Sequence, residues 1–497
     1  MPGIIAFERV SKWYPGAARP ALEPDRWEMP RGVRDILRSR VARVGDVERQ
    51  LLSAGAAIGR SFDFETLRAT SGRGEEEALV GVERLLAAGL LRESTGPEGA
   101  PVYDFSHEQL RALVYADTSL ARRRLPAPVF HYIDGGADDE VTLRRNTQAF
   151  DEVDLVPDVL AGLETVDMSV TVFGRRLQLP VFLSPTALQR LFHWQGERAV
   201  GAAAAAFGTC FGISSLATVS IEEIGATVAA PKLFQLYVHK DQGLNRELVA
   251  RARAAGFDAL ALTVDTAVGG NRERCLRTGF TSPPRLTPSN ALSWARHPAW
   301  VWNFLFREPF RLPNLDAVYA EGSRTALSIG DYFTQLLDPA LDWAAAERIR
   351  ADWGDRPFCL KGVMSAGDAR RALDIGATAL MISNHGGRQL DGSRAPFDQL
   401  AEIADAVGGR IELILDGGVR RGTHVLKALA RGATAVSGGR LYLYALAAAG
   451  EAGVRRALGN LRAEIERDMK LMGLPSLAAL GPGHLRPRPG ASLPPAP

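Results

Sequence analysis

Short apolar runs alternate with longer amphipathic stretches through residues 181–438 of the chain. Runs that are apolar on both faces are typical of parallel strands buried inside an α/β protein. The predicted strands are Val181–Leu183, Cys210–Ser214, Leu233–Tyr237, Ala259–Asp265, Phe358–Val363, Ala379–Asn384, Ile411–Asp416 and Ala435–Gly438. Eight strand and helix units predict a (β/α)8 TIM barrel. A doubly wound sheet is the alternative, but the absence of a GxGxxG motif favours the barrel.

The chain before residue 124 has a different pattern. Arg31–Leu52 and Glu75–Leu91 have helical periodicity, and a third helix is predicted over residues 107–123. The predicted domains are a mostly helical N-terminal extension over residues 1–123, a barrel over 124–475 and a proline-rich, disordered tail over 476–497. The sequence contains no GxxxxGKS/T motif, so the extension is not expected to bind ATP through a P-loop.

Composition narrows the functional classes. The chain has 497 residues, of which 46% are hydrophobic and 23% charged, and its formal net charge is +2. These are the proportions of an ordinary soluble protein, and the small net charge argues against a nucleic-acid partner. Cys210, Cys275 and Cys359 form no CxxC or zinc spacing, which favours a reduced cytoplasmic setting and no metal site. The sequence shows neither a signal peptide nor an apolar run long enough to span a bilayer.

The stretch Ser383–Gly392, after the sixth predicted strand, carries the strongest chemical signal. A histidine can act as a base near neutral pH, and an arginine can bind a carboxylate through two parallel hydrogen bonds. His385 and Arg388 flank two adjacent glycines, which let the backbone pass close to a flat ligand. The stretch therefore predicts proton transfer beside an acid group.

The ends of the other predicted strands carry further polar residues, and the active sites of TIM barrels lie at these ends. Glycine-rich turns after the last two strands, together with Arg420 and Arg440, are typical of a phosphate site. Asp416 is a misfit beside a phosphate and suits the hydroxyl groups of a ribityl chain instead. Lys361 is expected to stabilise negative charge on a reduced flavin ring. The neutral residues that suit the polar edge of a flavin are Ser214, Gln235 and Thr263.

Five longer motifs run in the same order as in a known enzyme family. They are Tyr132–Ala137, Phe234–Tyr237, Thr263–Thr266, Ser383–Gly392 and Asp416–Gly422. On these motifs, residues 124 to about 472 closely resemble the FMN-dependent α-hydroxy-acid oxidases and dehydrogenases. Gly270–Arg274 and the region around Leu191–His193 are most similar to the L-lactate dehydrogenase branch. The resemblance implies a TIM barrel, an FMN cofactor and oxidation of an L-2-hydroxy acid to the 2-oxo acid.

The resemblance also implies a role for each matching residue. His385 is expected to be the base, taking a proton as hydride passes to flavin N5, or taking the Cα proton in a carbanion scheme. Asp265 is expected to stabilise the protonated imidazole. Tyr132 and Tyr237 are expected to bind the substrate and to act in catalysis. The carboxylate-binding residues are then Arg272 and Arg388. The expected FMN-binding residues are Pro185, Thr186, Ala187, Ser214, Gln235, Thr263, Lys361, Asp416, Gly417, Gly418, Arg420, Gly439 and Arg440.

Four positions beside these residues differ from the family pattern. Leu216 stands where the glycolate-preferring members have tryptophan, which favours lactate or a somewhat larger 2-hydroxy acid. Leu441 replaces a proline, and His424 and His131 each replace an aspartate. None of these changes removes a predicted catalytic group.

Residues 30–123 resemble a helical fragment found after the ATPase core of large bacterial regulators. Two alternatives to the enzyme stay open, namely a regulatory or binding protein with an inert barrel, and a flavin-dependent non-redox isomerase.

The segment 285–312, rich in aromatic residues and arginine, either packs over the barrel mouth or contacts a membrane surface. The resemblance implies a quinone, a cytochrome or oxygen as electron acceptor, and a homo-oligomer. The expected location is the cytoplasm, with peripheral contact to the inner membrane under the second interpretation.

Overall fold

A computed structural model describes residues 117–281, 288–315 and 335–488 of the chain, and in its N-terminal part residues 47–48, 51–52, 54, 61–71, 73–88, 90–95 and 101–105. The chain divides into two units, residues 1–116 and 117–497. The predicted boundary at residue 123 falls inside helix α6 (Asp117–Arg124). Ala121 and Leu125 are buried in the core of the barrel unit, so α6 belongs to that unit and the boundary lies earlier than predicted.

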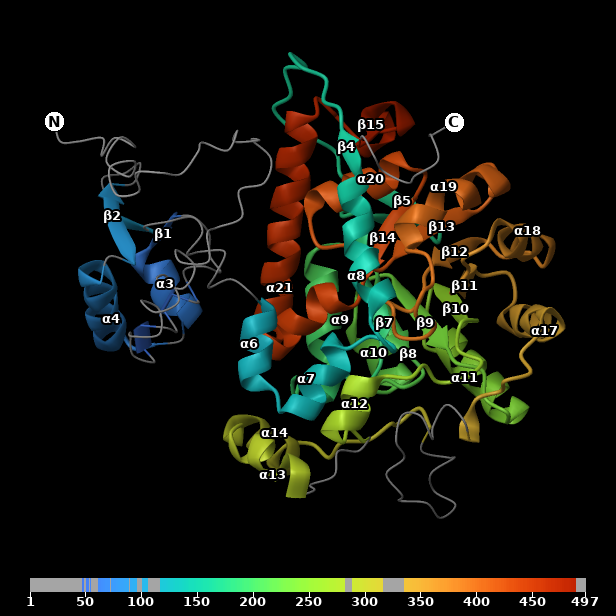
Figure 1. Ribbon diagram of the computed structural model, residues 1–497, viewed down its shortest axis with the longest axis horizontal. Coiled ribbons are helices and arrows are strands. Elements are labelled where there is room, and N and C mark those ends of the chain that lie inside the picture. The colour runs from blue at the N-terminus through green and yellow to red at the C-terminus, as the bar shows by residue number, and fades with distance from the viewer. Residues whose placement is uncertain are drawn as a thin grey trace, which may run out of the picture. The chain divides into compact units, whose positions relative to one another are not determined.

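Eight parallel strands close into a barrel, which confirms the predicted (β/α)8 fold (Figure 1). The strands are β7 (Val181–Thr186), β8 (Phe211–Ser214), β9 (Lys232–Leu236), β10 (Ala259–Thr263), β11 (Phe358–Lys361), β12 (Ala379–Ile382), β13 (Glu412–Asp416) and β14 (Ala435–Gly438). They pair in sequence order, and β14 closes the ring by pairing with β7. Each strand overlaps its predicted run, with ends that differ by at most three residues.

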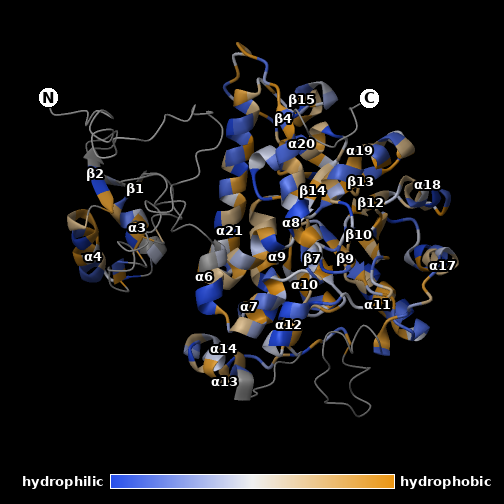
Figure 2. Cartoon of the chain, in the orientation of Figure 1, coloured by the Kyte–Doolittle hydropathy of each residue, from blue (hydrophilic) through white to orange (hydrophobic). Residues whose placement is uncertain are grey.

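Helices between the strands, and one after the last strand, cover the outside of the barrel (Figure 1). They are α9 (Glu197–Ala206), α10 (Ile221–Thr227), α11 (Gln242–Ala254), α17 (Trp343–Trp353), α18 (Ala366–Asp374), α19 (Pro396–Val407), α20 (Gly422–Ala430) and α21 (Arg440–Leu471). These helices carry both hydrophilic and hydrophobic residues (Figure 2), as expected when one face packs on the strands and the other meets water. The backbone of α21 leaves helical geometry at Ala449 and Gly450, so this helix bends there.

The chain enters the barrel through α7 (Ala127–Asp134), α8 (Val141–Gln148), the 3-10 helix η3 (Ala149–Glu152) and β4 (Val153–Leu155). A hairpin of β5 (Val170–Val172) and β6 (Arg175–Leu177) follows. Its Phe173 packs with residues of the barrel interior such as Met381, and the Phe173 backbone N–H donates to the carboxylate of Glu412 at the start of β13. The hairpin therefore covers the amino end of the barrel and leaves the carboxyl end for chemistry.

Two of the cysteines contribute to the barrel interior. Cys210 and Cys359 are free and fully buried, and burial raises the pKa of each thiol. A buried thiol with a raised pKa is not nucleophilic at neutral pH. These two residues therefore act as small apolar side chains.

The end of the chain is ordered further than predicted. The 3-10 helices η5 (Leu477–Ala479) and η6 (Pro482–His484) lead into β15 (Leu485–Pro487), which pairs antiparallel with β4. The predicted disorder from residue 476 is wrong for residues 477–487, because Leu477 and Leu485 are buried in the core and β15 gains a strand partner. Residues 489–497 lie outside the described residues.

The described residues of the first unit are mostly helical, as predicted, and also form three short strands. Its described elements are β1 (Ser61–Asp63), α3 (Phe64–Ser71), α4 (Glu75–Ala87), β2 (Leu91–Thr95) and β3 (Pro101–Phe105). The strands form an antiparallel sheet in the order β1-β3-β2. The predicted helix Glu75–Leu91 is present as α4, but it ends at Ala87, and Leu91 begins a strand instead. The predicted helix Arg31–Leu52 lies mostly outside the described residues, and the likeness to a regulator fragment stays a prediction.

A long connection between β10 and α17 contains α12 (Glu273–Thr278), α13 (Pro288–Ala295) and α14 (Pro298–Phe306). Trp294 and Trp300 are buried against the barrel unit, as the packing interpretation predicts. Trp302 and Phe306 on α14 are instead 62% and 66% exposed. No helix among the described residues is both long enough and apolar enough to cross a membrane.

Candidate active site

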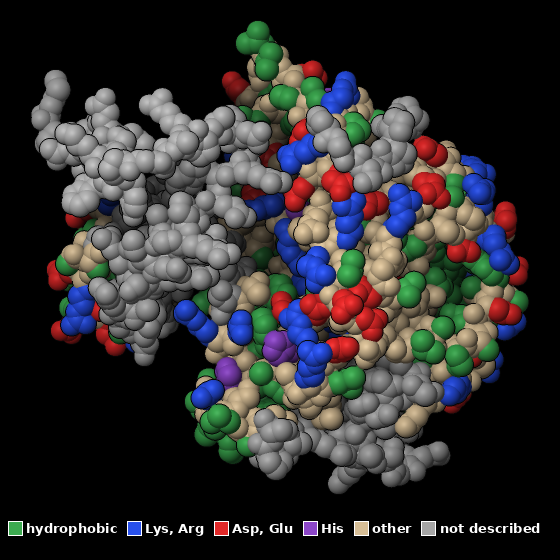
Figure 3. Space-filling model, in the orientation of Figure 1, with side chains coloured by type: hydrophobic (Ala, Val, Ile, Leu, Met, Phe, Trp, Pro, Cys, Tyr) green, Lys and Arg blue, Asp and Glu red, His purple; other side chains and the backbone are tan. Residues whose placement is uncertain are grey.

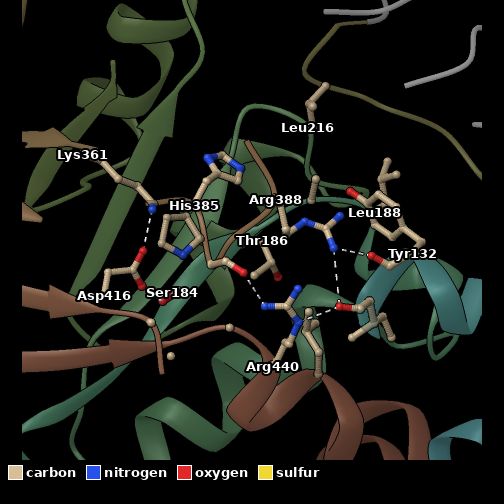
Figure 4. A pocket seen from close by; sticks show the side chains of 18 of the residues that line it. Tyr132, Ser184, Thr186, Leu188, Leu216, Lys361, His385, Arg388, Asp416 and Arg440 are labelled. Atoms are coloured by element: carbon tan, nitrogen blue, oxygen red, sulfur yellow. Dashed lines mark hydrogen bonds and ion pairs between the residues drawn. The ribbon is translucent and has the colours of Figure 1, made fainter. Parts of the chain in front are cut away.

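A pocket lies at the carboxyl end of the barrel, and most of the predicted site residues line it (Figure 4). The predicted residues in its wall are Tyr132, Pro185, Thr186, Ala187, Leu216, Tyr237, Arg272, Lys361, His385, Arg388, Asp416, Gly417, Gly418, Arg420, Gly439 and Arg440. They come from the ends of seven barrel strands, from α7 and from the loop that precedes α12. The closed ring thus brings together residues that are more than 300 positions apart in the chain.

The loop after β12 is held in an unusual backbone conformation. His385, Gly386 and Gly387 have φ angles of +57°, +66° and +73°. A histidine in the left-handed region is uncommon and is typical of residues held in place for function. The Ser383 hydroxyl accepts a hydrogen bond of 3.1 Å from the His385 backbone N–H, and this bond helps to fix the turn. The conformation aims the His385 ring into the pocket (Figure 4).

Both nitrogens of the His385 ring have partners. Nδ1 lies 3.1 Å from Asp265 Oδ1, and Nε2 lies 3.3 Å from the Tyr237 hydroxyl. Burial lowers the pKa of His385, and Asp265 partly opposes this by favouring the charged ring. The neutral ring then donates from Nδ1 to Asp265 and leaves Nε2 as the acceptor. Burial, followed by the charge of Asp265, raises the pKa of Tyr237, so this phenol stays protonated and can donate.

Two arginines share the same side of the pocket. Arg272 is buried, and burial followed by the nearby charge of Arg388 lowers its pKa to about 10. The Arg272 guanidinium group therefore remains charged at neutral pH. Arg388 stacks on Tyr132 with 4.7 Å between the guanidinium carbon and the ring centre, and donates to the carbonyl of Tyr132. Among the described residues no carboxylate forms an ion pair with Arg388, so this side of the pocket is suited to bind an acid group.

Lys361 and Asp416 form a buried ion pair of 2.5 Å (Figure 4). Burial works against both charges, but their mutual attraction raises the pKa of Lys361 and lowers the pKa of Asp416 to about 2. Asp416 also accepts from the hydroxyls of Ser184, Ser383 and Ser437 at 2.6, 2.8 and 2.6 Å. A carboxylate offers about four acceptor positions, and all of them are used here. A hydrogen bond from a ribityl hydroxyl, the role predicted for Asp416, would have to replace one of these bonds.

The end of the pocket that is predicted to hold a phosphate is built by β13, β14 and the start of α21. The helix begins at Arg440, directly after Gly439, and such helix starts attract anions. Arg440 donates to the carbonyls of Ile133, Gly135 and Gly386, each at 2.8 Å, and is thereby held rigid. Burial and then the charge of Arg388 lower its pKa to about 9.

Arg420 lies at the same end of the pocket, and its surroundings are well suited to a phosphate. Its side chain donates at 3.3 Å to the neighbouring Val419 carbonyl. No carboxylate within the described parts of the chain forms an ion pair with it, and burial lowers its pKa. A bound phosphate would supply the missing negative charge.

Three predicted cofactor residues are buried beside the pocket without lining it. Gln235 donates to the Thr263 hydroxyl at 2.6 Å, and the Ser214 hydroxyl accepts from the Leu216 backbone at 3.2 Å. The Gln235 Oε1 atom is buried without a partner among the described residues. A ring N–H group of a cofactor would satisfy it.

One side of the pocket is aliphatic. Leu216 lies there with Leu188 and Leu312, and Figure 4 shows the labelled leucines toward Tyr132 and Arg388, away from Lys361. Leu216 is 8% exposed. This wall lies on the same side of the pocket as Tyr132 and Arg388 and offers apolar surface to a bound molecule.

The departures from the family pattern are accommodated by packing. His424 stacks on Phe150 with 4.4 Å between the ring centres, and burial lowers its pKa to about 4, so it is neutral. Leu441 packs closely beside Gly438. A Cβ atom added to Gly438 would lie 3.0 Å from the Cβ atom of Leu441. Burial lowers the pKa of His131 as well, and its ring packs edge-on against Phe130.

The pattern of the sequence missed several residues that complete the site. Ser184, Ser383 and Ser437 hold Asp416, and Gln389 joins the loop of Asp265 to the loop of His385. Leu188 and Leu312 extend the aliphatic wall. Ser184 and Ser437 stand at predicted strand ends, and this position could have identified them as site residues. Leu312 comes from the long connection, where no pattern in the sequence points to the site.

Comparisons with known proteins agree with this geometry. The family model for FMN-dependent dehydrogenases matches residues 121–487. An L-lactate oxidase from Nostoc sp. is 40% identical over 382 residues, which cover 76% of this chain and 96% of the relative. An L-lactate dehydrogenase from Pseudomonas aeruginosa is 40% identical over 369 residues, which cover 73% of this chain and 95% of the relative. The crystal structure of the monotopic membrane protein (S)-mandelate dehydrogenase has a TM-score of 0.69 and 33% identity, over 75% of this chain and 98% of that one.

The residues of the pocket fit the cofactor that this family uses. Within the part of the chain that the structure describes, Arg420 forms no ion pair with a carboxylate, and Gln235 Oε1 accepts no hydrogen bond. The match covers more than half of the chain and most of each relative. The chain therefore belongs to the FMN-dependent dehydrogenase family, and it is an FMN-dependent oxidoreductase of 2-hydroxy acids.

Proposed function

We propose that the chain oxidises an L-2-hydroxy acid, L-lactate or a somewhat larger acid, to the 2-oxo acid with His385 as the base. The observation that carries the proposal is the pairing of His385 Nδ1 with Asp265 at 3.1 Å, which leaves Nε2 in the pocket beside Tyr237. A neutral ring with an unprotonated nitrogen that faces the pocket is the form that a base requires. Arg272 and Arg388 then bind the carboxylate and hold the substrate beside it.

Bound FMN supplies the acceptor for the two electrons that leave the substrate carbon. His385 Nε2 takes a proton from the substrate, either from the hydroxyl or from Cα. The resulting imidazolium is stabilised by Asp265 across the 3.1 Å contact. The protonated Tyr237 phenol donates to the substrate oxygen, and Tyr132 orients the carboxylate through its stacked neighbour Arg388. Lys361 holds a positive charge at the inner end of the pocket.

The remaining predicted residues are proposed to hold FMN. Arg420, Arg440 and the glycines after β13 and β14 bind the phosphate. Gln235 accepts from the ring through Oε1, and Thr263 and Ser214 support it from behind. The residues proposed to contact the remainder of the cofactor are Pro185, Thr186, Ala187 and Asp416.

The aliphatic wall supports a preference for substrates with a side chain. Leu216, Leu188 and Leu312 offer apolar surface, and burying each methylene group contributes about 0.8 kcal/mol. Glycolate has no side chain to use this surface. Lactate and larger 2-hydroxy acids are therefore the proposed substrates.

The electrons pass on to a membrane quinone, a cytochrome or oxygen. Contact with the inner membrane through residues 285–312 supports the first of these acceptors. Leu292, Trp302 and Leu305 in this segment are each more than 60% exposed, and the solved relative (S)-mandelate dehydrogenase is a monotopic membrane protein. A homo-oligomer remains a prediction from the family resemblance.

Anaerobic mixing of the purified protein with L-lactate tests the function. We expect the flavin absorbance at about 450 nm to disappear. The variant His385→Gln should stay yellow but bleach about 10²–10⁴ times more slowly, because it keeps the fold and loses the base. D-lactate serves as the stereochemical control. Wild-type protein that stays yellow with lactate, mandelate and longer L-2-hydroxy acids would contradict the proposal, and the rate of reoxidation in air would separate an oxidase from a dehydrogenase.

A further inference from the structure

A second cavity of about 450 Å³ lies outside the barrel mouth. Its walls come from α6, from the loop after β7, and from α13 and α14. Arg123 and Arg124 line it from α6, Arg190 and His193 from the loop, and Arg296 from the end of α13. None of these residues belongs to the active site, and the function described above leaves the cavity unexplained.

The walls of this cavity are fixed to one another. Trp300 on α14 donates from its indole nitrogen to the Leu191 carbonyl at 2.6 Å. Arg190 donates to the Pro309 carbonyl at 3.0 Å, and the backbone N–H of Ala127 donates to the Ser293 hydroxyl at 2.8 Å. These bonds join α7, the loop after β7 and the α13–α14 hairpin. The cavity is therefore a built feature and not a gap between loosely placed segments.

The charge of the cavity wall is strongly positive. Glu308 is the acidic residue in the wall, and its carboxylate is engaged by Arg198 at 2.8 Å and by Arg190 at 3.7 Å. Arg123, Arg124 and Arg296 have no carboxylate partner within the described part of the chain. Burial, followed by the charge of Arg124, lowers the pKa of His193 to about 4. An anion in the cavity would relieve this excess of positive charge.

Part of the cavity wall is aromatic. Trp300 and Phe304 stack with 4.9 Å between their ring centres, and both face the cavity from α14. The outer side of the same helix carries Trp302 and Phe306, which are exposed. On the face shown in Figure 3, hydrophobic side chains gather over α13–α14, and Lys and Arg side chains lie close by over α6. One helix thus separates a cationic cavity from an exposed apolar surface.

We propose that this cavity binds the headgroup of an anionic phospholipid, with the phosphate at Arg124 and Arg296 and the acyl chains along the aromatic wall toward the exposed side of α14. Clustered arginines match a phosphate, and aromatic side chains suit the boundary between headgroups and acyl chains. The inference rests on the proposed membrane contact of residues 285–312 and gives that contact a preferred lipid class.

Binding of a monomeric short-chain lipid to the full-length protein tests the cavity without a membrane surface. Dihexanoyl-phosphatidylglycerol, kept below its micelle concentration, is titrated and followed by calorimetry. We expect saturable binding by the wild type and about tenfold to thirtyfold weaker binding by the double variant Arg124→Gln/Arg296→Gln, because two charges near the phosphate are removed. The matched control is Arg348→Gln/Arg370→Gln on α17 and α18, which removes the same charge elsewhere and should bind as the wild type does.

Further measurements distinguish lipid binding in the cavity from the alternatives. Equal binding by the double variant and the wild type would overturn the assignment of the cavity. Equally tight binding of glycerol 3-phosphate would overturn the lipid and point to a soluble phosphate ester. Sedimentation with phosphatidylglycerol vesicles tests the membrane contact itself, so a wild type that binds the monomeric lipid but no vesicle would overturn only that contact. Bleaching by the substrate should be unchanged in both double variants, which checks that they are folded.

Discussion

At the scale of single residues, the active site depends on how His385 is held. Its backbone occupies the left-handed region, and its ring is fixed between Asp265 and Tyr237. Burial lowers the pKa of the ring, while the Asp265 carboxylate raises it. The net lowering keeps the ring neutral near pH 7, and the carboxylate is ready to stabilise the proton that arrives during the reaction.

The variant Asp265→Asn should therefore change both the rate and its pH dependence. Loss of the carboxylate removes the contribution that raises the His385 pKa, so the acidic limb of the kcat/KM profile should move to lower pH. At neutral pH kcat should fall about 10²–10⁴-fold, because the protonated ring loses its counter-charge and its fixed tautomer. Steady-state kinetics across pH measure both effects. An acidic limb that stays in place would show that Asp265 does not act on the ring.

Leu216 offers a test of substrate size at the same scale. Replacing it with tryptophan should fill the space beside Leu188 and lower kcat/KM for mandelate about 10–100-fold relative to glycolate. The ratio of the two kcat/KM values, measured on wild type and variant, gives the answer. A loss of the same size for both acids would mean that the variant disturbs the site as a whole.

At the scale of elements, the loop after β12 is fastened to the segment before the barrel. The backbone N–H of Ala137 donates to the Gly387 carbonyl at 2.9 Å. The side-chain amides of Asn146 and Asn384 exchange two hydrogen bonds, of 2.8 and 2.7 Å. Asp391 accepts from the backbone N–H of Thr142 at the start of α8. The position of the base therefore depends on a helix that lies about 240 residues earlier in the chain.

Gly387 makes this fastening possible. Its φ angle is +73°, and an added Cβ would lie 2.6 Å from the Leu143 backbone nitrogen. We expect Gly387→Ala to cost about 3 kcal/mol of unfolding free energy and to lower kcat, because the loop has to move. The control is Gly392→Ala, which has a φ of +78° but open space around it, and should cost about 1 kcal/mol. Chemical denaturation measures both. Equal losses would assign the effect to backbone strain alone.

Much of the barrel could be predicted from the sequence, and the reasons are visible in particular elements. The barrel strands are continuous apolar runs, so their pattern is unambiguous. By contrast, β15 has the residues Leu485–Pro487, one apolar side chain between glycine- and proline-rich stretches, and its partner β4 is remote in sequence. The strand β2 is largely polar, and a helix pattern extends into it. Such strands form only because they pair with a partner strand, and the partner cannot be predicted from the sequence of one segment.

The same limit applies within the site. The sequence placed Lys361 and Asp416 at strand ends but assigned them to different parts of the cofactor. The structure joins them directly, at 2.5 Å. Which polar groups satisfy one another depends on the register of neighbouring strands, and this register comes from closure of the barrel. The chemistry of the residues was predictable, whereas their mutual bonds were not.

At the scale of the whole molecule, the barrel unit contains every residue to which a role in the reaction is assigned. Residues 117–497 hold the pocket, the closed ring of strands and the matched family region from residue 121 onward. The first unit has a small core of its own, with Leu67 and Leu85 among its buried residues.

A chain that begins at residue 117 should therefore fold, bind FMN and bleach with substrate at the rate of the full chain. Absorbance and stopped-flow kinetics of the two proteins measure this. A chain that begins at residue 127 is the informative comparison, because it lacks α6 and with it the buried Ala121 and Leu125. Loss of flavin from both shortened chains would show that the first unit supports the barrel.

The bonds around Asp416 have a consequence for how the enzyme is assembled. The carboxylate, at the end of β13, is bound by Ser184 from β7, Lys361 from β11, Ser383 directly after β12, and Ser437 from β14. Five of the eight strand ends are thus cross-linked by protein groups alone. The apoprotein should keep the shape of the flavin cradle, so that the coenzyme can leave and return without refolding. Preparations that are colourless because they have lost the flavin should then regain activity when FMN is added.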